Sequence, residues 1–199
     1  MIDAATMERF RGYFGKIREY VDNFLNDVLP EADDPYDAEQ EYREDLRDIL
    51  GYNTQVYFGA SRTVIVFNNE DWVIKIPRSL DDMYYNAREV ENYEKAPQKL
   101  KPFFAECAFL DKDMCVTIMQ SVICDGDRVE SLQYESHNYG EDDNDFDNDV
   151  SFDLYGGLTL WDDLYQYLCD RDINDLHEEN VGWLDTSEDL PVMIDYAGY

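Results

Sequence analysis

The sequence predicts an α+β fold, in which an N-terminal helical extension precedes an antiparallel sheet with one helix and a smaller acidic segment. Three observations predict it. Near the N-terminus, apolar residues recur at three- and four-residue steps, which is typical of amphipathic helices. Short β-branched runs separated by turn residues follow, and a final apolar pattern predicts one more helix and a strand. We expect three segments, at residues 1–50, 51–122 and 123–199.

The first segment contains two expected helices. Residues 5–29 form the first, which Pro30 should end, and residues 38–50 form the second, with Gly51 at its end. The apolar stripe of the first helix comprises Met7, Phe10, Phe14, Ile17, Val21, Phe24 and Val28. A helix of this kind needs a packing partner. The two helices therefore either pack into the core or form a brace or partner surface ahead of the sheet.

The pattern of the second segment predicts a sheet whose strands are interrupted by one helix. The order is three strands, a helix and two strands, expected at residues 54–58, 63–67, 72–76, 80–95, 104–110 and 115–119. In the third segment we expect a helix at residues 158–169. A short apolar strand at Val192–Ile194 follows an acidic turn at residues 185–189.

Composition and charge restrict the function. With 199 residues, of which 44% are hydrophobic, the chain can form one sizeable core or two small lobes. It has no apolar run of about 18 residues and no signal-peptide pattern, so we expect no membrane partner. The four cysteines lack C-x-x-C spacing, which is typical of reduced thiols. We therefore expect a cytoplasmic protein.

The net charge of −30 is concentrated near the C-terminus, where residues 121–199 carry 22 acidic and two basic side chains. Such a field repels nucleic acid and attracts basic proteins. It also repels ATP, so a nucleotide site would need Mg²⁺ and a local cluster of bases. Residues 141–150 carry six acids and no base, and we expect a solvated loop there. The charge either serves a binding surface or only keeps the protein soluble.

Lys75 is the first candidate functional residue. It lies within the strand-like run Trp72–Ile76, where a lysine is costly unless its charge is used. An acid on the following helix would be its partner. Glu89 and Glu91 are both available, but they lie about 200° apart around a helix, so only one of them can face Lys75.

The second candidate site lies near the C-terminus. Asp175 precedes Asn180 by five residues, and Asp195 follows the apolar run that ends at Ile194. Phosphoryl transfer needs a carboxylate to orient the attacking hydroxyl, and an amide and a carboxylate to bind Mg²⁺. These three residues supply those groups.

With these residues the chain resembles the protein-kinase-like superfamily, in particular small aminoglycoside-phosphotransferase-type and phage-encoded kinase-like proteins. The resemblance covers about residues 50–199. It implies a kinase-like N-lobe and a minimal C-lobe. It also implies that Lys75 pairs with the α and β phosphates of ATP, and it selects Glu89 over Glu91 as the partner of Lys75. Asp175 matches the catalytic-loop aspartate, and Asn180 and Asp195 match the residues that bind Mg²⁺.

Two positions and one segment depart from the family pattern. Ile173 and Asn174 replace the histidine and the arginine or glycine that precede the catalytic aspartate, and the histidine is a structural brace rather than a reacting group. The segment from Gly59 to Arg62 replaces the glycine-rich phosphate loop. In that segment, the amides of Gly59 and Ser61 and the charge of Arg62 could bind phosphate, although a plain hairpin turn explains the same residues.

The resemblance and the acidic charge of residues 121–199 together suggest two functions. The first is an Mg·ATP-dependent phosphotransferase or a degenerate relative of one. The chain ends four residues after Asp195, so we expect a small acceptor, self-phosphorylation or a partner that completes the site, rather than a peptide substrate. The second is an acidic pseudokinase-type inhibitor that mimics nucleic acid and blocks a basic host protein. A phage origin, and hence the host cytoplasm, is expected from the resemblance alone.

Overall fold

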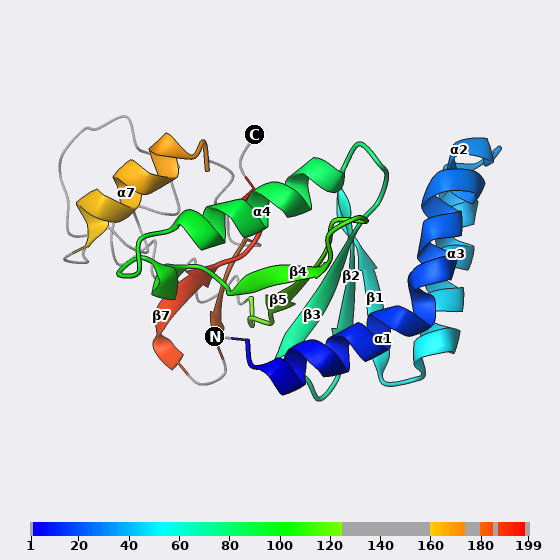
Figure 1. Ribbon diagram of the computed structural model, residues 1–199, viewed down its shortest axis with the longest axis horizontal. Helices are drawn as coiled ribbons and strands as arrows, with labels where there is room; N and C mark the ends of the chain where they lie inside the picture. Colours follow the sequence, from blue (N-terminus) through cyan, green and yellow to red (C-terminus); the bar gives the residue numbers. More distant parts are fainter. Residues whose placement is uncertain (1, 125–159, 174–179, 185–186, 198–199) are drawn as a thin grey trace. The chain divides into compact units, whose positions relative to one another are not determined.

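The computed structural model describes residues 2–124, 160–173, 180–184 and 187–197 (Figure 1). The chain forms two compact units. The first contains residues 1–90 and 106–121, and the second contains residues 91–105 and 122–199. Helices and an antiparallel sheet are both present, so the predicted α+β class is confirmed. None of the helices within the described ranges is both long and apolar enough to cross a membrane.

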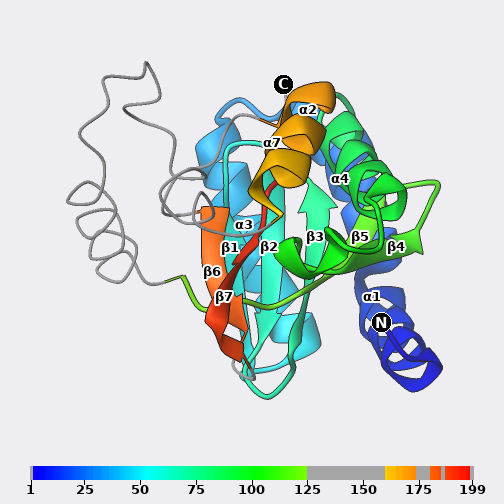
Figure 2. The same ribbon diagram turned by 90° about the vertical axis from the view of Figure 1, so that its left-hand side faces the viewer.

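The first unit contains a five-stranded sheet in the order β1-β2-β3-β5-β4, with every neighbouring pair antiparallel. Figure 2 shows the five strands side by side in this order. The strands are β1 (Thr54–Phe58), β2 (Arg62–Phe67), β3 (Trp72–Pro77), β4 (Cys107–Asp111) and β5 (Val116–Gln120). Helix α4 (Met83–Lys95) and the short helix η2 (Lys101–Phe103) connect β3 to β4. The predicted order of strands and helix is therefore confirmed.

The N-terminal helices begin and end at residues suited to these positions. They are α1 (Ala4–Asn23), the π-helical turn η1 (Phe24–Val28), α2 (Leu29–Glu31) and α3 (Pro35–Leu50). The Asp3 carboxylate accepts a hydrogen bond of 2.7 Å from the Thr6 amide and caps α1, and Asp34 caps α3 in the same way. Gly51 ends α3 with a φ of +100°, a conformation that glycine adopts without strain.

The structure corrects two expectations about the first helix. Pro30 does not end it, because helical backbone continues to Glu31. The wide turn η1 lies just before Pro30, and it relieves the clash that a proline ring makes with the preceding turn of a regular helix. The same turn shifts the helical phase, so that Phe24 and Leu25 are both buried. Val28, expected on the apolar stripe, is 43% exposed.

Helix α1 packs against one face of the sheet. Its buried residues Phe10, Phe14, Ile17 and Val21 form one cluster with strand residues such as Ile74. Successive side chains of a strand point to opposite faces. Lys75 therefore points to the face of the sheet opposite Ile74. Helix α1 of the N-terminal extension covers the Ile74 face. Of the two roles left open for the helices, core packing is the one that the contacts of α1 confirm.

The second unit contains α7 (Trp161–Asp170) and a hairpin of β6 (Val181–Leu184) and β7 (Ser187–Met193). Val181 pairs with Met193, and Leu184 pairs with Ser187 across a register shift. The acidic turn expected at residues 185–189 is therefore too long, because pairing across the hairpin extends β7 back to Ser187. The chain at Ile123 joins the edge of β6 through two hydrogen bonds with Trp183, of 2.8 and 3.0 Å.

Replacing Gly182 by alanine is expected to destabilise the second unit by about 1–3 kcal/mol, because the new methyl group would overpack the hairpin. A Cβ at Gly182 would lie 2.7 Å from a methyl carbon of Val122 and 2.8 Å from the carbonyl oxygen of Ile123. Urea unfolding measures the change. Gly15→Ala is the matched control: no atom lies within 4 Å of its Cβ, so it should stabilise α1 by about 0.5–1 kcal/mol. Equal effects of the two changes would contradict this packing.

Candidate functional site

Lys75 lies on the face of the sheet opposite the α1 core. Its neighbours in register are Val64 on β2 and Thr117 on β5. Ile74 and Ile76, on either side of it in β3, belong to the hydrophobic cluster on the other face. Lys75 is only 6% exposed. The alternation of β3 therefore places a cation in the interior of the first unit, where it requires a counter-charge.

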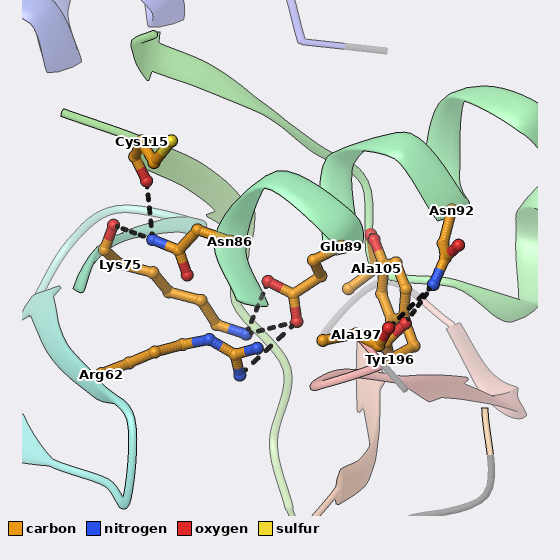
Figure 3. A network of polar contacts seen from close by, with 9 residues as sticks. All are labelled: Arg62, Lys75, Asn86, Glu89, Asn92, Ala105, Cys115, Tyr196 and Ala197. Atoms are coloured by element: carbon orange, nitrogen blue, oxygen red, sulfur yellow. Dashed lines mark hydrogen bonds and ion pairs between the residues drawn. The ribbon is translucent and has the colours of Figure 1, made fainter. Parts of the chain in front are cut away.

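Glu89 on α4 supplies this counter-charge. The Lys75 Nζ donates to both carboxylate oxygens of Glu89, at 3.0 and 3.2 Å, and Glu89 is fully buried (Figure 3). Glu91, the alternative partner, instead binds Lys95 and lies 3.4 Å from Arg171. The hydrogen bonds from Lys95 and Arg171 lower the pKa of the Glu91 carboxyl. The predicted pairing of Lys75 with Glu89 is thus confirmed.

Asn86 fixes helix α4 against the sheet. Its side-chain amide donates to the carbonyl oxygens of Lys75, at 3.0 Å, and of Cys115, at 2.9 Å (Figure 3). Asn86 precedes Glu89 by three residues, so both lie on the same side of the helix. It therefore sets the rotation at which Glu89 faces Lys75. Asn86 was not among the residues predicted from the sequence, although its position three residues before Glu89 indicated that the two side chains share one side of the helix.

Arg62 adds a second buried cation. Its guanidinium lies 3.8 Å from the Glu89 carboxylate and 5.8 Å from the centre of the Tyr85 ring, and the residue is 4% exposed. Figure 3 shows the Arg62 and Lys75 side chains converging on Glu89. Arginine and lysine side chains both form charge-assisted hydrogen bonds with phosphate.

The turn between β1 and β2 contains the residues proposed as a phosphate loop. The Gly59 amide donates to the Arg62 carbonyl oxygen at 2.8 Å, which closes the hairpin. Arg78 donates from its side chain to the Gly59 carbonyl oxygen, at 2.7 Å, and from its amide to that of Ser61, at 3.1 Å. Arg78 also binds Glu39, and so ties the turn to α3. The role of Gly59 and Ser61 in binding phosphate stays a prediction.

The two candidate metal ligands come together in the second unit. Asn180 precedes β6, and Asp195 lies two residues after β7, so both lie at the same end of the hairpin. The Ile194 amide donates to the Asn180 carbonyl oxygen at 2.8 Å. Asp195 has a φ of +56°, a conformation uncommon for residues other than glycine and enriched at functional sites. Asp175 lies outside the described residues.

The chemistry of Asn180 and Asp195 fits Mg²⁺. Both offer hard oxygen ligands, and Mg²⁺ usually binds one or two protein oxygens and completes its shell with water and substrate phosphates. Among the described residues, no group of three or more histidine, cysteine or acidic side chains could hold a metal ion.

Comparison with protein-family models, with curated proteins and with solved structures finds no match to this chain. Arg62, Lys75 and Glu89 belong to the first unit, and Asn180 and Asp195 belong to the second.

Proposed function

We propose that this protein is a kinase-like phosphotransferase that binds Mg·ATP and transfers the terminal phosphoryl group to a hydroxyl acceptor. One observation carries the proposal: the buried ion pair between Lys75, on the third strand of the sheet, and Glu89, on the helix that follows. Protein kinases hold ATP with a lysine and a glutamate in this arrangement. Removing two charges from water is costly, and a buried pair contributes little net stability. A role in binding phosphate accounts for the buried pair of Lys75 and Glu89.

Each residue has a distinct role in this proposal. Lys75, oriented by Glu89, pairs with the α and β phosphates, and Arg62 adds positive charge. Asn180 and Asp195 would hold Mg²⁺, which neutralises charge on the phosphates when it is bound. The Asp175 carboxylate orients the acceptor hydroxyl and accepts its proton. The acceptor oxygen then forms a bond to the terminal phosphorus, the bond to the bridging oxygen breaks, and ADP leaves.

Calorimetric titration of Mg·ATP into the wild type and into Lys75→Met tests the nucleotide site. We expect the wild type to bind and Lys75→Met to bind at least about tenfold more weakly, a change of about 1.4 kcal/mol or more. Lys95→Met is the matched control, because Lys95 is an exposed lysine paired with Glu91 on the same helix. Its affinity should equal that of the wild type. Circular dichroism should confirm that all three proteins are folded.

Two results would contradict the proposal. A wild type that does not bind Mg·ATP would leave the buried pair without a nucleotide role and would favour the acidic inhibitor of a basic host protein. Equal binding by the wild type and Lys75→Met would place any nucleotide elsewhere.

Phosphoryl transfer is tested separately with Asp175→Ala, which should keep nucleotide affinity and lose turnover. The acidic loop at residues 141–150 lies outside the described residues, so its role as a binding surface stays a prediction.

A further inference from the structure

The side chain of Asn92, near the end of α4, is the centre of a buried network in the second unit. It is fully buried, and its Nδ2 donates to the carbonyl oxygens of Tyr196, at 2.8 Å, and Ala197, at 3.3 Å (Figure 3). Its Oδ1 accepts from the Arg171 Nε at 2.8 Å. Carbonyl oxygens cannot donate and arginine cannot accept, so these partners fix the orientation of the amide without ambiguity.

This network holds the chain immediately after Asp195. The Tyr196 ring is fully buried, its hydroxyl donates to the Ala105 carbonyl oxygen, and it packs edge-on against Phe104 with ring centres 5.1 Å apart. On the other side of Asp195, the Ile194 amide binds Asn180. Asp195 is therefore anchored through both of its neighbours, and its φ of +56° lies between these two anchors. A residue in such a conformation persists only where its surroundings determine it.

We infer that Asn92 is a positioning residue for the divalent metal that accompanies ATP. By holding the backbone of Tyr196 and Ala197, it keeps Asp195 in the left-handed conformation that presents its carboxylate at the Asn180 end of the hairpin. The inference rests on the proposed function, because the metal that it concerns is the one that accompanies ATP. It assigns a role to a residue that contacts neither the nucleotide nor the metal.

The substitution Asn92→Asp isolates this role. The new carboxylate has almost the shape of the amide and still accepts from Arg171, but it cannot donate to the two carbonyl oxygens. Tyr167→Phe is the matched control: it removes the hydrogen bond from the Tyr167 hydroxyl to the Asn92 carbonyl oxygen, of 2.5 Å, and leaves the side-chain amide of Asn92 in place. Asn92→Asp removes two buried hydrogen bonds and Tyr167→Phe removes a partly buried one, and only the first change releases the segment after Asp195.

The measurement is a titration of Mn²⁺ in the presence of ATP, with free Mn²⁺ followed by electron paramagnetic resonance. ATP binding in EDTA is measured in parallel by calorimetry. We expect Asn92→Asp to raise the apparent dissociation constant of Mn²⁺ by at least about tenfold and to change metal-free ATP binding less than about twofold. Tyr167→Phe should leave both values unchanged. If Asn92→Asp does not fold, Asn92→Ser, which keeps one donor in a smaller side chain, should show the same effect on Mn²⁺ at reduced size.

The possible failures are distinguishable. If the wild type binds ATP with Mn²⁺ and the Asn92 variants do so with the same metal dependence, the inference is overturned and the proposed function stands. If the variants weaken ATP binding equally with and without metal, Asn92 is a general structural residue and the inference is also overturned. If the wild type binds ATP under neither condition, the proposed function fails, and the inference fails with it.

Discussion

Replacing Glu89 by alanine is expected to lower the free energy of unfolding by about 3–5 kcal/mol, because it removes one partner of a buried ion pair. Lys75 would lose both of its hydrogen bonds to Glu89, at 3.0 and 3.2 Å, and Arg62 would lose the Glu89 carboxylate at 3.8 Å. Both cations are buried, and the loss of a carboxylate beside a buried cation is costly. Urea unfolding followed by circular dichroism measures the change.

The control for Glu89→Ala is Glu91→Ala. Glu91 lies two residues further along the helix and pairs with Lys95 at an exposed position, where an ion pair contributes little to stability. If the two substitutions cost the same, the carboxylate of Glu89 does not hold two buried cations, and the observation that supports the proposed function loses its force.

A triple replacement separates stability from function at the same site. Arg62→Leu, Lys75→Met and Glu89→Leu together remove all three charges and leave apolar side chains of similar size. Replacing a buried ionic group in this way is often neutral or stabilising by about 1–4 kcal/mol. We expect this variant to be at least as stable as the wild type and unable to bind Mg·ATP. A variant that is stable and still binds nucleotide would show that the charges do not serve the phosphates.

The sequence predicts the strands well because each of them alternates or clusters β-branched residues between turn residues, and the register of Lys75 follows from that alternation. It does not predict the π-helical turn at Phe24–Val28, where Phe24 stacks on the ring of Tyr42 and Leu25 is also buried in the core cluster. Tertiary packing decides such details, and a pattern with a period of 3.6 residues contains no sign of an inserted residue.

The candidate site was predicted in part. Spacing restricted the partner of Lys75 to Glu89 or Glu91, and the resemblance selected Glu89. Asn86 and Asn92 were overlooked because asparagines on a charged helix look like surface residues. Yet both are fully buried, and they lie three positions before and after Glu89. Polar residues at three positions spaced three residues apart, as here, therefore indicate a buried polar stripe.

Replacing Phe10 by alanine is expected to destabilise the first unit by about 3–5 kcal/mol, because it opens a cavity between α1 and the sheet. Phe10 is fully buried, and its ring meets Phe67 of β2 edge-on with centres 5.5 Å apart. Tyr52→Ala is the control, since Tyr52 is fully exposed and should change stability by less than about 0.5 kcal/mol. Thermal and urea unfolding both measure the difference.

The result decides what the N-terminal helices do. If α1 is a detachable brace or partner surface, Phe10→Ala should cost little, and the sheet should unfold at the same urea concentration as in the wild type. The contacts of Phe10, Phe14 and Ile17 with the strands support the other outcome. In that case α1 completes the core on the Ile74 face of β3, and its loss disturbs the strand that carries Lys75 on the opposite face. Substitutions in α1 would then weaken nucleotide binding only as far as they unfold the first unit, whereas Lys75→Met would weaken it also in the molecules that stay folded.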